Sequence, residues 1–234
     1  VETTPGILSW EEGKRLAEAT LKAYRENHNG EYPRKVSYSF WAGEFITTEG
    51  ATLAQVFWML GVEPIRDKMG RVVDLRLVPS SELGRPRVNV VVQVSGQLRD
   101  IAGSRLTMLT HAVRLASAAD DKAYPNYVSS GTRLQEKLLV EKGVSPKRAR
   151  EMSVMRVFGP VNSGYSTGMM AYTEKSDRWD HESELVDGYL NNMGAAYGDE
   201  ESWGGMQKDL FASALSETDV VIQPRQSNTW GPLS

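Results

Sequence analysis

Hydrophobic residues along this chain recur at two spacings, one typical of helices and one typical of strands. Apolar residues at 53, 56, 57 and 60 form one helix face, and Gly61 stands where a helix-ending glycine is expected. The segment 88–94 is almost continuous valine, which is typical of a strand covered on both faces. The segment 72–78 alternates apolar and polar residues, which predicts a half-buried strand at a sheet edge.

Further elements follow from the same patterns. Ser9 and Glu12 form a capping-box pattern that predicts the start of a first helix, and Asn29-Gly30 ends it. Ser145 before Pro146 predicts another helix start. The remaining predicted strands are 36–40, 154–158 and 220–222. Two further helices are predicted at 102–116 and 134–141. Two more follow, one capped by Asp180 that bears Leu185, Tyr189 and Met193, and one that bears Met206, Leu210, Phe211 and Ala214.

Strands that alternate with helices predict an α/β fold, a three-layer, mostly parallel, doubly wound sheet flanked by helices. We expect residues 1–234 to form a single domain. The leading helix within 1–31 is either part of that domain or a linker to a preceding region. The chain lacks an initiator Met and ends abruptly after Trp230-Gly231-Pro232-Leu233-Ser234 without a polar tail, so we expect it to be cut from something longer.

Composition excludes several classes of protein. The chain has 234 residues, a formal net charge of −3 and no cysteine. Without cysteine, a disulfide framework, a thiolate zinc site and a cysteine nucleophile are impossible. The balanced charge argues against a nucleic-acid partner, which would require a basic excess. No apolar run approaches the roughly 20 residues of a membrane span, and the first residues do not resemble a signal peptide. These features favour a cytoplasmic location.

Polar, glycine-containing loops follow four of the predicted strands. In open α/β sheets, ligands bind beyond the carboxyl ends of the strands. The pattern leaves two alternatives, a ligand site along one edge of the sheet or ordinary polar turns. The loop at 159–168 lacks the lysine of a P-loop, so no ATP-binding motif is recognisable. The loops cover residues 41–50, 95–100, 159–168 and 223–230.

Charged residues in these loops are candidates for chemistry. Arg99-Asp100 is either a local ion pair at a helix start or an arginine aimed at a ligand carboxylate and held by its neighbour. Glu44 and Glu49 precede a helix, and their spacing alone favours ordinary helix-start acids. The histidines lack the spacing of a metal motif, so no permanent metal site is expected, although carboxylates leave a transient one open. They are His28, His111 and His181.

The run from Glu82 to Asp100 is the most specific motif in the chain. Two parts of this run resemble the CobN and magnesium-chelatase H-subunit family: Glu82-Leu83-Gly84-Arg85-Pro86-Arg87-Val88 and Val90-Val91-Val92-Gln93-Val94-Ser95-Gly96-Gln97-Leu98-Arg99-Asp100. Matches continue in order from about Tyr32 to the C-terminus. The resemblance implies a fragment of a much longer tetrapyrrole-binding subunit, which inserts Co(II) or Mg(II) into the macrocycle. It also implies separate AAA-type ATPase subunits that use the ATP.

Residues 223–230 look more like the cobalt-inserting branch, which acts in cobalamin biosynthesis. Carried over onto these motifs, the resemblance implies catalytic roles for Glu44, Glu49 and Asp100. It implies substrate binding by Arg99, Arg156, Tyr165, Asp199, Arg225 and Asn228. A structural role for each residue remains an alternative. Two other functions also remain open, a magnesium-chelatase H-subunit fragment and a non-catalytic module that docks the ATPase subunits.

Overall fold

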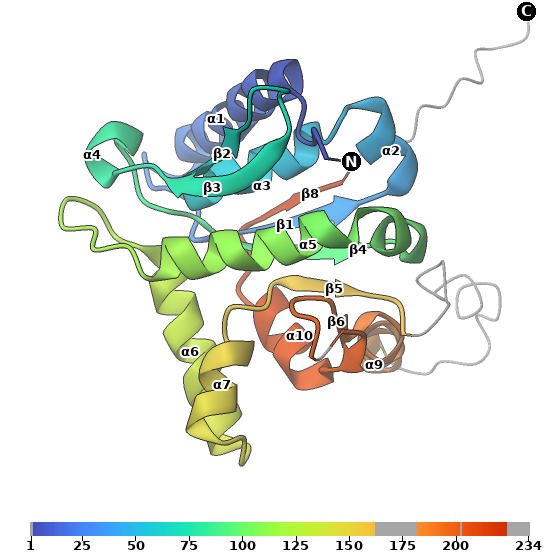
Figure 1. The fold of residues 1–234 in the computed structure, drawn as a ribbon. Coiled ribbons are helices and arrows are strands. Elements are labelled where there is room, and N and C mark those ends of the chain that lie inside the picture. Colours follow the sequence, from blue (N-terminus) through green and yellow to red (C-terminus); the bar gives the residue numbers. More distant parts are fainter. Residues whose placement is uncertain (1, 162–181, 202, 224–234) are drawn as a thin grey trace, which may run out of the picture.

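A six-stranded sheet with the strand order β7-β6-β5-β4-β1-β8 forms the centre of the molecule in the computed structural model (Figure 1). The structure describes residues 2–161, 182–201 and 203–223. Strands β1, β4, β5 and β8 run parallel, and the two short strands at one edge run antiparallel. The strands are β1 Lys35–Phe40, β4 Asn89–Val94, β5 Val157–Gly159, β6 Ala195–Ala196, β7 Gly205–Met206 and β8 Val220–Ile222.

Helices cover both faces of this sheet, which confirms the predicted fold class (Figure 1). Val90 and Val92 of β4 belong to one core cluster and Val91 belongs to the other, because successive side chains of a strand point to opposite faces. One layer contains α1 Ile7–Asn27, α2 Ala42–Thr47, α3 Ala51–Leu60 and α5 Gly96–Ser117. The other contains α6 Tyr127–Glu141, α7 Pro146–Met152, α9 Glu182–Met193 and α10 Lys208–Leu215.

The alternating segment at 72–78 is a half-buried strand at a sheet edge, as predicted, but it belongs to a separate small sheet. It forms β3 Val72–Leu77, which pairs with β2 Val62–Arg66 in a separate antiparallel hairpin. Leu75 is buried against the main core and Val73 is exposed. A hairpin that packs on a helix layer has one buried and one solvent-exposed face. Its apolar and polar residues therefore alternate as they would in an edge strand of the main sheet.

The first helix begins earlier than predicted. It starts at Ile7 with Gly6 as its N-cap, and the hydroxyl of Ser9 donates to the Thr48 carbonyl at 2.7 Å, so the capping-box interpretation is wrong. Trp10, Ala17 and Leu21 of this helix belong to the main core cluster. The helix therefore packs as part of the layered structure.

The predicted start of one further helix is confirmed, and the predicted starts of two others differ from the structure by several residues. Ser145 caps α7 with Pro146 in its first turn, as predicted. Met206 lies in β7 and the last helix begins only at Lys208, whereas α6 begins at Tyr127, ahead of the predicted 134.

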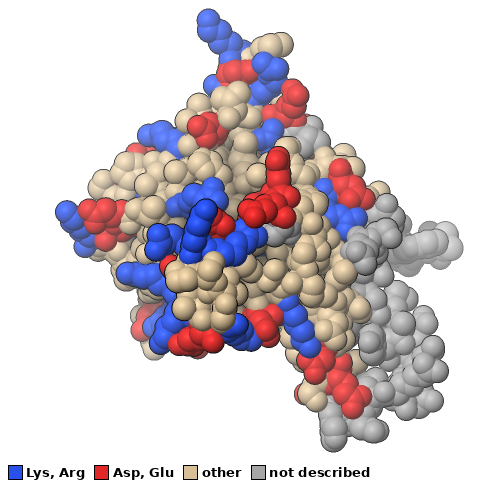
Figure 2. All heavy atoms as spheres, turned by 60° about the horizontal axis from the view of Figure 1, so that its bottom comes forward, with Lys and Arg blue, Asp and Glu red and all other residues tan. Residues whose placement is uncertain are grey.

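Within the described ranges, every helix is too short or too polar to cross a lipid bilayer. Cationic and anionic side chains are interspersed on the face shown in Figure 2.

Gly61 ends α3 in the left-handed conformation, with a φ of 72°. A Cβ atom built there would come within 2.3 Å of Nη1 of the buried Arg87. We expect Gly61→Ala to lower the free energy of unfolding by at least about 2 kcal/mol, because the backbone strain and the displaced guanidinium add. Urea unfolding measures this change. Gly70→Ala is the control: its φ is 79° and nothing lies near its added Cβ, so it should show the backbone strain alone.

Candidate functional site

Because β8, β1, β4 and β5 are parallel neighbours, their carboxyl ends lie at the same edge of the sheet. Glu44 and Glu49 follow β1, and Arg99 and Asp100 follow β4 in the first turn of α5. The structure therefore brings four of the predicted site residues to one edge. The described parts of the loops after β1 and β4 therefore lie at one edge of the sheet, and ligand binding by them stays a prediction.

Glu44 is held by two threonine hydroxyls. Its Oε1 accepts a hydrogen bond from Thr52 at 2.6 Å and another from Thr48 at 3.1 Å. Its Oε2 is buried and has no hydrogen-bond partner among the described residues. A buried carboxylate oxygen without a donor is unfavourable unless a ligand supplies one. Glu44 therefore has a fixed orientation and one carboxylate oxygen that no described residue satisfies.

A pocket of 490 Å³ lies between α1 and the segment from α2 to α3, and Glu44 lines it. Glu49 also lines it, with a left-handed φ of 50° and a backbone carbonyl that accepts from Gly6 at 3.0 Å. Two further residues, Glu12 and the nearly buried Gln55, line this pocket and were not among the predicted site residues. Glu12 was noticed in the sequence, but its spacing of three residues from Ser9 led to its interpretation as part of a helix cap.

Arg99 joins the ends of two strands. Its Nε donates to Asp100 at 2.8 Å, which confirms the local ion pair, and its Nη1 donates to the Tyr197 hydroxyl at 3.1 Å. The hydrogen bond to Asp100 raises the pKa of the Arg99 guanidinium, which stays charged. Asp100 is half exposed, with 48% of its side chain accessible. Tyr197 was missed as a site residue, although it belongs to a segment that carries the family resemblance.

Arg156 and Asp199 lie elsewhere, at the amino ends of the parallel strands. Arg156 precedes β5 and is fully buried, and its Nε donates to Asn89 at 3.1 Å. Burial lowers the pKa of its guanidinium to about 10. Strand β6 runs antiparallel to β5, so the chain after it returns toward the same end, where Asp199 pairs with Arg148 at 3.5 Å. Neither residue shares the edge with Glu44 and Arg99, and their predicted substrate contacts stay predictions.

Three predicted residues, Tyr165, Arg225 and Asn228, lie outside the described residues, as do His181 and the predicted cap Asp180. Among the described residues, no group of three or more histidines and acidic residues is arranged to hold a metal ion. His111 lies on α5 with its Nε2 at 3.4 Å from Asp74, on the surface.

Comparisons with known proteins give one consistent result. The CobN/Magnesium Chelatase family model matches residues 1–234. Magnesium-chelatase subunit ChlH from rice is 31% identical over 97% of this chain and 16% of its own length. Aerobic cobaltochelatase subunit CobN from Sinorhizobium sp. is 30% identical over 94% of this chain and 17% of its own length.

A solved structure agrees with these relatives. The catalytic subunit of cobaltochelatase from Mycobacterium tuberculosis superposes with a TM-score of 0.85 and 32% identity, over 95% of this chain and 18% of that one. The chain thus spans less than a fifth of the length of the proteins it matches. Since the family model covers every residue, this chain belongs to the CobN/magnesium chelatase family.

Proposed function

We propose that this chain is part of the tetrapyrrole-binding subunit of an ATP-dependent cobaltochelatase that inserts Co(II) into a corrin ring in cobalamin biosynthesis. Family membership over the whole chain carries this proposal, supported by its likeness to a cobaltochelatase catalytic subunit. Co(II) is a substrate in this proposal. Separate AAA-type ATPase subunits use the ATP, the remaining domains of the large subunit complete the site, and the complex works in the cytoplasm.

Glu44 supplies the base in this proposal. Insertion of a divalent metal requires that the N–H protons leave the ring nitrogens, one from a corrin and two from a porphyrin, and a nearby base accelerates this step. Oε2 of Glu44 is the proposed acceptor because both threonine hydroxyls bind the other oxygen and no described residue binds this one. Glu49 lines the same pocket and offers a second carboxylate, which suits a divalent ion that must exchange water for oxygen ligands.

Arg99 and Asp100 serve substrate binding and positioning. Arginine recognises carboxylates, which tetrapyrrole substrates carry at their periphery. The guanidinium of Arg99 is held in place by Asp100 and Tyr197, so little side-chain freedom is lost when a ligand binds. Asp100, half exposed, faces the same edge of the sheet and is the third catalytic candidate.

Magnesium insertion into protoporphyrin is the second candidate function. The rice magnesium-chelatase subunit and the Sinorhizobium cobaltochelatase subunit match this chain at 31% and 30% identity, so overall similarity favours neither metal. The two functions differ in both metal and macrocycle, and a direct assay separates them.

The test uses the protein assembled with its ATPase subunits. We expect a saturable change in the macrocycle absorption spectrum on binding, then ATP-dependent insertion of Co(II) into the corrinoid at a rate at least about a hundredfold above that of Mg(II) into protoporphyrin. The reverse rate order would establish the magnesium function. Absence of macrocycle binding under saturating conditions would contradict both and favour a module that docks the ATPase subunits.

A further inference from the structure

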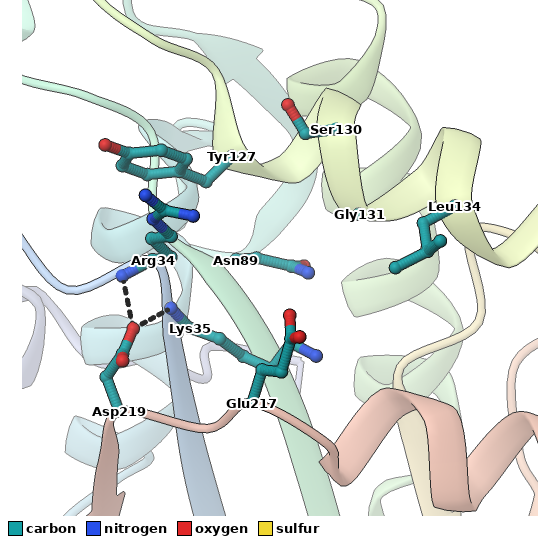
Figure 3. A pocket seen from close by; sticks show the side chains of 9 residues that line it. All are labelled: Arg34, Lys35, Asn89, Tyr127, Ser130, Gly131, Leu134, Glu217 and Asp219. Atoms are coloured by element: carbon teal, nitrogen blue, oxygen red, sulfur yellow. Dashed lines mark hydrogen bonds between the residues drawn. The ribbon is translucent and has the colours of Figure 1, made fainter.

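A second pocket, of 540 Å³, lies at the amino end of the sheet, opposite the edge that carries Glu44 and Arg99 (Figure 3). Four separate segments line it: the start of β1, the start of β4, the first turns of α6 and the loop before β8. Its volume lies within the range of small-molecule sites, roughly 300–1,000 Å³. The lining residues are Arg34, Lys35, Asn89, Tyr127, Ser130, Gly131, Leu134, Glu217 and Asp219.

Asn89 presents a fixed hydrogen-bond donor to this pocket. Only 4% of the residue is exposed, and its Oδ1 accepts from Arg156 at 3.1 Å and from the Val90 amide at 3.0 Å. These two bonds fix which way the side-chain amide points. Its Nδ2 faces Gly131, where an added Cβ would come within 2.3 Å, and makes no hydrogen bond with any described residue. A nearly buried amide thus directs its N–H groups into the cavity.

The charges around the pocket leave an excess of positive charge. Arg34 and Lys35 line it, and the fully buried Arg156 lies behind Asn89. Arg156 bonds only neutral groups among the described residues, with Thr132 and two backbone carbonyls completing its partners. Burial, and then the charge of Arg156, lower the pKa of Lys35. An anion in the pocket would offset this repulsion.

Two carboxylates face these three cations. Asp219 accepts from the backbone amides of Arg34 at 2.7 Å and Lys35 at 3.3 Å, so it holds the two chain segments together (Figure 3). Glu217 stands across the pocket from α6 (Figure 3). Three cations against two carboxylates leave one positive charge, which a single negative charge balances.

The wall formed by α6 adds apolar surface. Leu134 lines the pocket and has 47% of its surface exposed. The ring of Tyr127 also lines it, and its centroid lies 5.9 Å from the Arg34 guanidinium. We propose that this pocket binds a small organic monocarboxylate, with the carboxylate at the Asn89 amide and the Arg34 and Lys35 cations and the hydrocarbon part against Leu134 and Tyr127. This site is separate from the edge assigned to the macrocycle and does not depend on that function.

Calorimetric titration with 3-phenylpropionate tests the proposal, with the uncharged 3-phenylpropanamide as the matched ligand. We expect saturable binding of the carboxylate and at least about tenfold weaker binding of the amide, because charge-assisted hydrogen bonds are lost. Ser130→Asp places a negative charge in the wall and should weaken binding by about tenfold or more. Ser129→Asp makes the same change one position earlier, outside the lining set, and should stay within about twofold of the original affinity.

A second measurement locates the bound ligand in the unsubstituted protein. The rate at which a reagent acylates Lys35, a lining residue, is followed by mass spectrometry with and without ligand. Saturating 3-phenylpropionate should protect Lys35 at least about tenfold, whereas the exposed Lys137 of α6 should react unchanged. Absent binding, equal affinity in Ser130→Asp, or binding without protection of Lys35 would each overturn the proposal. Protection by inorganic phosphate but not by the carboxylate would also overturn it.

Discussion

Replacing Glu44 with glutamine is expected to lower the rate of metal insertion by the assembled chelatase about a hundredfold, the lower end of the usual contribution of a general base. Glutamine retains an oxygen that can accept the hydroxyls of Thr48 and Thr52, so the local fold should persist. It replaces the unpartnered Oε2 with an amide nitrogen that does not accept a proton. Affinity for the macrocycle should change by less than about threefold, because the base acts after binding.

Two matched variants make this result specific. Glu12 lines the same pocket, but its carboxylate pairs with Arg15, so Glu12→Gln should leave insertion within about twofold. Glu49→Gln tests the second carboxylate of the pocket. Insertion that is unchanged in both Glu44→Gln and Glu49→Gln would remove these residues as candidates for the base. A loss of macrocycle affinity as large as the loss of rate would assign Glu44 to binding.

The chain's periodicity predicts most of the sheet, but local patterns mislead where tertiary contacts decide. The valine run gave the central strand because both its faces are covered. Strand β2 was missed because Pro64 lies inside it, and proline is unfavourable in the middle of a sheet. The hairpin tolerates this proline because its two strands form a sheet of their own, in which each strand is an edge.

Candidate residues were found where their strand direction could be inferred. Glu44 and Arg99 follow parallel strands, so the rule for strand ends places them together. Asp199 follows β6, whose antiparallel direction has no local signature in two alanines. The two threonines that orient Glu44 follow it by four and eight residues, one after the end of α2 and one in α3. This spacing is the one expected within a continuous helix, so it gave no sign of hydrogen bonds formed across a turn between two helices.

Arg87 and Asp121 form a buried ion pair that links three segments. Nε of Arg87 donates to Asp121 at 2.7 Å, and the two side chains are 1% and 4% exposed. Its Nη1 donates to the Leu60 and Gly61 carbonyls, and its Nη2 donates to Val78 at 2.6 Å. The guanidinium thereby connects the end of α3, the residue after the β2–β3 hairpin and the loop after α5. Removal of the carboxylate would leave this cation buried without its charged partner.

We expect Asp121→Asn to lower the free energy of unfolding by about 3–5 kcal/mol, the usual cost of breaking one side of a buried pair. For a domain of this size, that corresponds to a melting temperature lower by about 10 °C. The neighbouring Asp120 is the control, because its side chain is 83% exposed and its pair with Lys122 lies on the surface. Asp120→Asn should change stability by less than about 0.5 kcal/mol.

Chemical unfolding of both variants decides the matter, because the substitution is the same and only burial differs. Equal stability of Asp120→Asn and Asp121→Asn would show that the Arg87 pair contributes no net stabilisation. Arg87→Met should cost more than Asp121→Asn, since it removes a donor from three backbone carbonyls and also leaves the carboxylate without its charged partner. The double variant should then cost less than the sum of the single changes, because each single change leaves the other charge buried and unpaired.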